Sequence, residues 1–271
     1  MAKTPSIEEA WKEFLNGVHT GPRLERALLK RLPTSPRCKV CFAPFAGVGG
    51  ALMRATGRRP FSKNPTYCNV CERWARKHRG GVEMEISFLF ADVRGSTTVA
   101  ERMSPVEFSR LMNRFYETAT RILVKADAWI DKLVGDEVIG FFFPYLGRHA
   151  WVAVGAAQEL LRAAGHAEGQ TPWLPVGAGV HTGIAYVGVV GAEDTVTDVT
   201  ALGDAVNVAA RLASLAGAGE ILVSDAAYPS AGLTETTYAH RQADLKGRAE
   251  PVGVHVLRVD AAGPVLSRAR A

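Results

Sequence analysis

The sequence predicts a mixed α/β (α+β) fold, in which a ferredoxin-like βαββαβ domain over residues 84–258 follows a small, helical, loop-rich module over residues 1–80. Three observations support this prediction. In the longer part, short apolar runs alternate with amphipathic helical patterns. A Gly135-Asp136 pair separates two of the apolar runs, as in a β-hairpin. Residues 33–80 contain five prolines and no sustained periodicity, which predicts loops.

Local patterns predict the individual elements. Ser6 and Glu9 form a capping-box signature that begins a first helix, whose apolar face is predicted to carry Ile7, Trp11, Leu15 and Val18. Ser104 and Pro105 begin a long amphipathic helix, and Asp204 is expected to cap a helix over 204–215. The other predicted elements are a helix over 22–32, strands over 84–91, 128–134 and 137–143, a helix over 148–164, strands over 175–181 and 184–190 joined by a turn, later short strands, and a tail over 259–271.

The composition excludes several classes of protein. Hydrophobic residues make up 47% of the chain and charged residues 22%, a balance that excludes disordered, coiled-coil and collagen-like architectures. The charged residues Glu8, Glu9 and Lys12 exclude a signal peptide at the start. The uncharged run 171–192 contains two prolines and several glycines, which is typical of strands rather than of a membrane helix. We therefore expect a soluble, cytoplasmic protein with no membrane partner.

Charge is distributed unevenly along the chain. Residues 1–80 hold 16 Lys and Arg against five Glu, a net charge of +11, whereas residues 81–271 hold 16 basic and 22 acidic residues, a net charge of −6. A basic segment of this kind engages nucleic acid, acidic lipid, the acidic part of the same chain, or only water. No aromatic-rich stacking surface accompanies it, so we favour a solvated basic surface and expect no nucleic-acid partner.

The four cysteines form two Cys-x-x-Cys knuckles in the basic module, Cys38 with Cys41 and Cys68 with Cys71. A two-residue spacer lets both thiolates of a knuckle face one ion, so the pattern predicts a tetrahedral metal site that holds the loops of residues 33–80 together. Four thiolates without a nearby histidine indicate structural Zn²⁺. An iron–sulfur cluster uses the same ligands and is the alternative. Redox-active thiol pairs, or reduced pairs without a metal, are the other interpretations.

Two aspartates lie where apolar strands end. Asp92 follows the run 88–91 and precedes a turn of small residues, and Asp136 lies at the tip of the predicted hairpin. If the two strands are neighbours, both carboxylates converge at one edge of the sheet. Such a pair of oxygen ligands holds Mg²⁺ or Mn²⁺ together with nucleotide phosphates. Each aspartate taken singly is also explained as a turn residue.

The helix over 204–215 carries Asn207 and Arg211, which are four residues apart and therefore share a face. An amide beside a guanidinium suits a ribose next to a reacting phosphate, because Arg donates to phosphate oxygens in a fork. Taken alone, this pair is better explained as an ordinary surface pair on an amphipathic helix.

Four segments of the chain, residues 90–97, 131–136, 176–183 and 200–211, together resemble the class III nucleotidyl cyclase catalytic domain. The resemblance covers about residues 84–258, in the order and spacing of the family. It implies two Mg²⁺ or Mn²⁺ ions in each active site and an active site at a homodimer interface. The roles that it implies are metal ligation by Asp92, Asp136 and the Val93 carbonyl, purine binding by Lys132 and Thr200, ribose orientation by Asn207, transition-state stabilisation by Arg211, and binding of the terminal phosphates by Lys246.

The combination of Lys132 with Thr200 resembles the adenylate-selective subset of the family, so the expected substrate is ATP. Asp198 lies two residues before Thr200 and points the same way on an extended segment, so a different register would change the base contact. The predicted reaction is adenylate cyclase chemistry, in which the ribose 3′-oxygen attacks the α-phosphorus and pyrophosphate leaves. The alternatives are a guanylate cyclase and a non-catalytic protein that senses nucleotides or binds nucleic acid.

Overall fold

The computed structural model describes residues 6–16, 29, 36–62, 65, 67–191, 198–233 and 238–259. The chain divides into two compact units. The first, here called the N-terminal unit, comprises Met1–Met84 and Ala185–Leu202, and the second, the sheet unit, comprises Glu85–Ile184 and Gly203–Ala271. Among the described helices, none is both long enough and apolar enough to cross a membrane.

The strands form one sheet in the order β2-β3-β1-β4-β6-β8-β7, and β5 pairs with β4. Its first four strands, with a helix after β1 and another after β3, have the ferredoxin-like order that the sequence predicts. The pairs β1–β3, β2–β3, β4–β5, β6–β8 and β7–β8 are antiparallel, and β4 and β6 are parallel. The strands are β1 (Gly81–Val93), β2 (Trp129–Val134), β3 (Glu137–Phe142), β4 (Val176–Val190), β5 (Asp198–Leu202), β6 (Glu220–Ser224), β7 (Ala239–Ala243) and β8 (Val252–Arg258).

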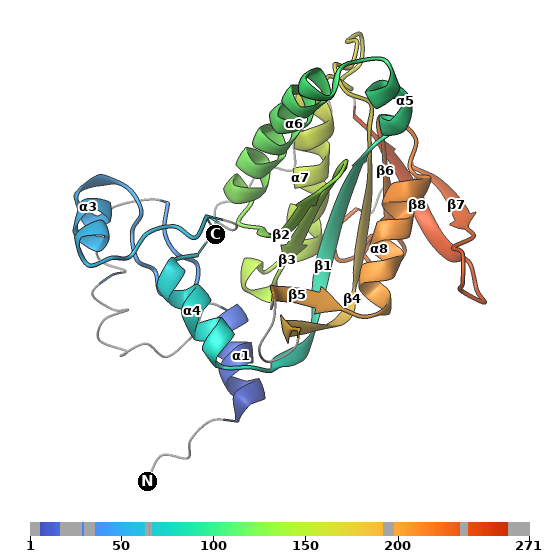
Figure 1. Cartoon of the computed structure of the whole chain (residues 1–271). Coiled ribbons are helices and arrows are strands. Elements are labelled where there is room, and N and C mark those ends of the chain that lie inside the picture. Colours follow the sequence, from blue (N-terminus) through green and yellow to red (C-terminus); the bar gives the residue numbers. More distant parts are fainter. Residues whose placement is uncertain are drawn as a thin grey trace. The chain divides into compact units, whose positions relative to one another are not determined.

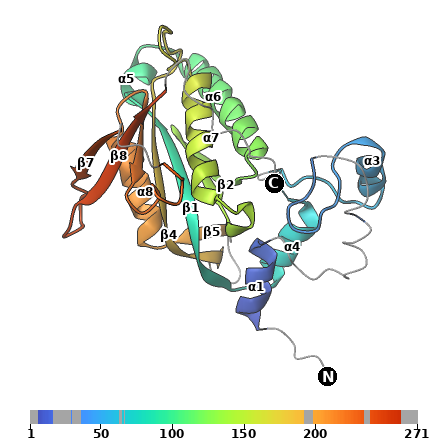
Figure 2. The same ribbon diagram turned by 180° about the vertical axis from the view of Figure 1, so that it is seen from behind.

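Helices cover both faces of the sheet in the sheet unit. Helices α6 (Pro105–Lys125) and α7 (His149–Ala163) contact each other and pack on one face, and α8 (Asp204–Leu215) packs on the other (Figures 1 and 2). Strand β6 shows the division, because Ile221 and Val223 join the core under α6 and α7, whereas Leu222 joins the core under α8. Successive side chains of a strand point to opposite faces, so β6 supports both layers.

Helix α6 illustrates how local sequence determines an element. The predicted start of this helix at Ser104 is confirmed, and it takes the form of a capping box: the Ser104 hydroxyl accepts a hydrogen bond from the Glu107 amide, and the Glu107 carboxylate accepts one from the Ser104 amide. Phe115 is fully buried, as the helical spacing predicts. The shorter helical segments of the sheet unit are α5 (Ser96–Glu101) and the 3₁₀ turn η1 (Pro144–Leu146).

Two expectations for the sheet unit are wrong. Residues 176–190 form one continuous strand rather than two strands and a turn. Gly183 is not a turn residue. A Cβ atom there would lie only 2.9 Å from the Cβ of Ala205, so this glycine allows α8 to approach the strand closely. Asp204 does not cap α8, since Gly203 occupies the N-cap position and Asp204 instead forms an ion pair with Arg248.

The N-terminal unit contains two helices where the sequence predicts loops. These are α3 (Gly47–Ala55) and α4 (Asn69–Lys77), each nine residues long and therefore too short for a clear periodic signal. The predicted first helix is confirmed as α1 (Ile7–Leu15), with both capping-box hydrogen bonds. Buried Trp11 of α1 packs against Trp74 of α4, with ring centroids 5.9 Å apart, and its indole nitrogen donates to the His78 carbonyl at 2.8 Å.

Three predicted features lie outside the described residues. They are the helix over 22–32, of which only Leu29 is described, the tail over 259–271 after Val259, and the position of Val18 in the first helix. The expectation that Ile7 lies on the buried face of the first helix is wrong, because this residue is exposed, whereas Trp11 and Leu15 are buried.

Candidate functional site

The structure brings the two predicted metal ligands to one edge of the sheet. Asp92 near the end of β1 pairs with Glu137 at the start of β3, in antiparallel register. Asp136 precedes Glu137 in the β2–β3 turn, and its carbonyl oxygen accepts a hydrogen bond from the Val93 amide at 3.0 Å. Gly135, which adopts a φ of 63°, permits this tight turn. The expectation that the two strands are neighbours is therefore confirmed.

Polar groups that the sequence analysis missed surround these two acids. The guanidinium of Arg94 forms an ion pair with Asp92 and donates to the Ser214 carbonyl at 2.7 Å. The Ser96 hydroxyl donates to the Asp136 carboxylate. The sequence held a signal for both partners, because Arg94 lies two residues after Asp92 in the turn after β1, and Ser96 lies four residues after it at the start of α5. The acids are thus oriented by hydrogen bonds and ion pairs of the protein itself.

The electrostatics of this edge favour a cation. Burial raises the pKa of Glu137, and the nearby Asp136 raises it further. Burial also lowers the pKa of Arg94, an effect that Asp136 and Glu137 oppose. Three carboxyl groups thus face one guanidinium, so the edge carries excess negative charge. Hard divalent cations such as Mg²⁺ bind this kind of oxygen-rich site.

A second group of predicted residues gathers around α8. Asn207 is exposed and Arg211 is half-buried on this helix. Lys246 is exposed in the turn between β7 and β8, where Gly247 has a φ of 83°. A Cβ atom on Gly247 would lie 3.6 Å from Nη2 of Arg211. The structure therefore brings Arg211 to the turn that carries Lys246, although the two are far apart in sequence.

The two predicted purine-binding residues lie on different strands. Lys132 is exposed on β2, at a point where the pairing with β3 shifts by one residue between Ile130 and Leu133. Such a bulge redirects a side chain from the regular alternation. Thr200 is buried on β5, opposite Gly188 of β4, and belongs to the N-terminal unit, whereas Lys132 belongs to the sheet unit.

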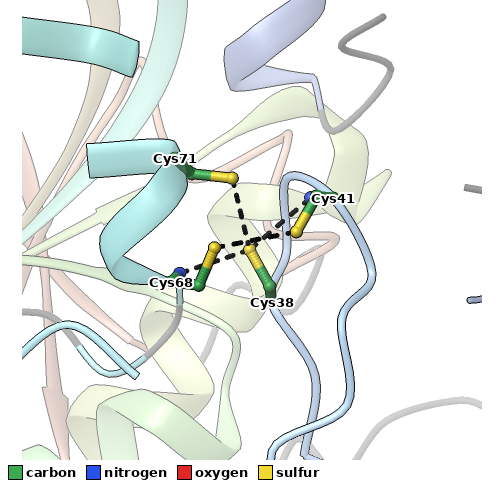
Figure 3. A group of neighbouring side chains, drawn as sticks. All are labelled: Cys38, Cys41, Cys68 and Cys71. Atoms are coloured by element: carbon green, nitrogen blue, oxygen red, sulfur yellow. Dashed lines mark hydrogen bonds between the residues drawn. The ribbon is translucent and has the colours of Figure 1, made fainter. Parts of the chain in front are cut away.

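The four cysteines converge in the N-terminal unit, with their sulfur atoms directed toward one another (Figure 3). The sulfurs of Cys38 and Cys71 are 3.7 Å apart, as are those of Cys41 and Cys68. All four are free thiols, because a disulfide would need a separation of about 2.05 Å. Each sulfur pair therefore joins one knuckle to the other, as expected for four ligands of one centre.

The cysteine geometry fits a single tetrahedral ion. An ion about 2.3 Å from four sulfurs requires sulfur–sulfur separations of about 3.8 Å, close to the 3.7 Å in the structure. An iron–sulfur cubane holds its ligands farther apart, because the cluster itself lies between them. The Cys68 amide donates to the Cys38 sulfur at 3.3 Å, and the Arg58 guanidinium donates to the Cys41 sulfur at 3.7 Å. Such donors stabilise the negative charge of metal-bound thiolates.

Comparison with known proteins defines the class of the protein. The family described as the adenylate and guanylate cyclase catalytic domain matches residues 82–258, so the chain belongs to this family. The resemblance on which the sequence analysis relied is therefore confirmed. An adenylate cyclase of Anabaena cylindrica is 32% identical over 136 residues, which cover 48% of this chain and 27% of the relative.

Solved structures of cyclases share the fold. The guanylyl cyclase Cya2 has a TM-score of 0.59 at 28% identity, and the match covers 68% of this chain and 96% of that structure. The adenylyl cyclase CyaB from P. aeruginosa has a TM-score of 0.56 at 30% identity, covering 66% and 96% respectively. The chain spans about a quarter of the length of the curated relatives it matches.

Proposed function

We propose that this protein is an adenylate cyclase that converts ATP to 3′,5′-cyclic AMP and pyrophosphate. The observation that carries the proposal is the convergence of Asp92 and Asp136 on neighbouring strands, within a chain that belongs to the cyclase family. These carboxylates, with the Val93 carbonyl, would hold two Mg²⁺ or Mn²⁺ ions. The ions would lower the pKa of the ribose 3′-hydroxyl and neutralise the triphosphate.

The remaining site residues have distinct roles in this reaction. Asn207 positions the ribose, so that the 3′-oxygen is in line with the α-phosphorus. Arg211 donates to the oxygens that gain charge at the α-phosphorus, and Lys246 holds the departing pyrophosphate. The short separation between Arg211 and the turn carrying Lys246 supports this division, because both cations must reach the same triphosphate.

The active site is proposed to form between two copies of the chain. The acids at the end of β1 form one group, and Arg211 with the Lys246 turn forms another. In a homodimer, the acids of one chain would face the α8 group of its partner, which gives two equivalent sites. Mixing Asp92→Ala protein with Arg211→Ala protein should restore part of the activity, because one intact site then forms in each mixed dimer. Absence of any recovery would contradict shared sites.

The choice of base rests on Lys132 and Thr200. A threonine hydroxyl and a lysine ammonium can donate to the acceptor nitrogens of adenine. Asp198 lies beside Thr200 on β5, and its carboxylate accepts a hydrogen bond from the neighbouring Val199 amide at 3.0 Å, which favours Thr200 as the base contact. A guanylate cyclase remains the competing assignment, and Asp198→Asn should leave activity with ATP unchanged if Thr200 makes the contact.

The four cysteines are proposed to hold a structural Zn²⁺ that orders the N-terminal unit. The sulfur separations support one tetrahedral ion over an iron–sulfur cluster. Free thiols suit a reducing compartment, so we infer a cytoplasmic protein. Metal analysis of the purified protein should give at least one zinc per chain and no acid-labile sulfide, and a visible iron–sulfur absorption would refute the assignment.

A product assay tests the enzymatic proposal. The protein is incubated with Mn²⁺ and either ATP or GTP, and the nucleotides are separated by chromatography. Cyclic AMP is expected in preference to cyclic GMP, and Asp92→Ala should abolish it without loss of folded structure. The matched control is Glu101→Ala, which removes an exposed carboxylate on α5 and should retain activity. Binding of nucleotide without any cyclic product would favour the non-catalytic sensor instead.

A further inference from the structure

Two histidines and an aspartate form a compact group on the sheet unit, and none of the three belongs to the sites discussed above. His240 of β7 and His255 of β8 are directly opposite each other in antiparallel register, and their ring centroids are 4.7 Å apart. Asp225 follows β6, and its Oδ1 atom lies 3.0 Å from Nε2 of His240 and 3.2 Å from Nε2 of His255. The three ligand atoms all lie within 4.8 Å of one another.

The backbone and an aromatic ring hold this group in place. The Asp225 amide donates to the Gly253 carbonyl at 2.9 Å, which fixes the aspartate to β8. The Asp225 carboxylate occupies the space that a side chain at position 253 would need, so only glycine allows it to lie there. Tyr228 stacks on His255 with ring centroids 3.5 Å apart and planes 9° apart. The ligand atoms are therefore arranged before any ion binds.

We propose that Asp225, His240 and His255 form a binding site for a divalent transition metal of the Zn²⁺ type. Two imidazole nitrogens with one carboxylate oxygen form a ligand set that such ions prefer, whereas Mg²⁺ prefers oxygen alone. An ion about 2.1 Å from each atom requires ligand separations of about 2.9 to 3.4 Å, and the aspartate lies 3.0 and 3.2 Å from the two nitrogens. Asp225 and His240 are exposed, so water can complete the coordination.

A hydrogen-bonded group with charged imidazoles is the competing explanation of the same geometry. The geometry favours the metal, because Nε2 of His240 and Nε2 of His255 approach the same Asp225 oxygen, at 3.0 and 3.2 Å, and the two histidines lie directly opposite each other on β7 and β8. Two adjacent imidazolium ions would repel each other. A metal ion avoids this repulsion, because it binds both imidazole rings in their neutral form and then carries the positive charge of the group itself.

Cobalt spectroscopy distinguishes these explanations in the full-length protein. The cysteine site is first filled with one equivalent of Zn²⁺, excess Mg²⁺ occupies the oxygen sites, and Co²⁺ is then titrated. We expect a further equivalent of Co²⁺ to bind, with visible bands of nitrogen and oxygen ligation and without the thiolate charge-transfer band. His240→Gln and His255→Gln should each weaken binding at least about tenfold, since even the loss of an outer-shell partner costs 10- to 100-fold.

Asp244→Asn is the matched control, because it removes an exposed carboxylate near the same strands without touching the group, and it should bind Co²⁺ like the unmodified protein. Circular dichroism of each variant establishes that it is folded. The proposal is overturned if no further Co²⁺ binds, if binding survives in the His240→Gln, His255→Gln double variant, or if the bound ion shows only thiolate ligation.

Discussion

Acidification below pH 6.5 should destabilise the sheet unit through His181 of β4. Its Nδ1 atom is 2.8 Å from the Ser224 hydroxyl oxygen. Burial lowers the pKa of His181 from 6.5 to about 4, against the opposing charge of Asp204. In the unfolded chain the same group has its ordinary pKa of about 6.5, so the unfolded state binds more protons between these values. The stabilisation is therefore complete above pH 6.5 and is lost as the pH falls toward 4.

The magnitude follows from the change in the pKa of His181. A fall from 6.5 to about 4, at 1.36 kcal/mol per pH unit, corresponds to about 3 kcal/mol of unfolding free energy. Two thirds of this, about 2 kcal/mol, is already lost at about pH 5. That loss is a large fraction of the 5–15 kcal/mol that typically separates folded from unfolded domains.

Urea denaturation of the wild-type protein and of His181→Asn, at about pH 7.5 and pH 5, measures the effect. Asparagine can accept the Ser224 hydrogen bond but takes up no proton in this range. Both proteins protonate the same carboxylates and cysteines, so the difference between them isolates His181. The wild type should lose about 2 kcal/mol more than the variant between the two pH values. Equal losses would refute the assignment of a buried, neutral His181.

Three further perturbations test the packing and the cysteine cluster. If the cysteines hold the proposed metal, removing it with a chelator should disorder the N-terminal unit and shift tryptophan emission to longer wavelength as Trp11 and Trp74 become more exposed; unchanged emission would show that no metal supports the unit. Gly188→Ala should lower the melting temperature, because the Cβ atom of the new alanine would collide with the Gly80 carbonyl oxygen. An unchanged melting temperature would show that the backbones at positions 188 and 80 are farther apart than in the structure. Phe141→Ala should cost about 3–5 kcal/mol in urea denaturation, since the ring is 1% exposed, and a cost below about 1 kcal/mol would contradict its place in the core.

The sequence predicts the convergence of the two acids but not the other contacts of the candidate site. Asp92 and Asp136 were identified because strand ends and hairpin turns leave local signals, and the register of β1 with β3 brings them together as expected. Arg94 was missed as the ion-pair partner of Asp92, because an arginine in a turn gives no sign of where its long side chain ends. The meeting of Arg211 with the Lys246 turn also depends on packing between distant segments.

Local signals determined several elements of this protein, although not α3, α4 or the continuous strand β4. Capping boxes at Ser6 and Ser104, the hairpin at Gly135 and the two cysteine knuckles each act over a few residues, and the structure has each of them. Only the tertiary structure decided the role of Gly183, because a glycine in a turn between strands and a glycine that lets a helix pack closely on a strand cannot be distinguished in the sequence. It also decided that His240 and His255 meet Asp225, since long-range register depends on the packing of the whole sheet.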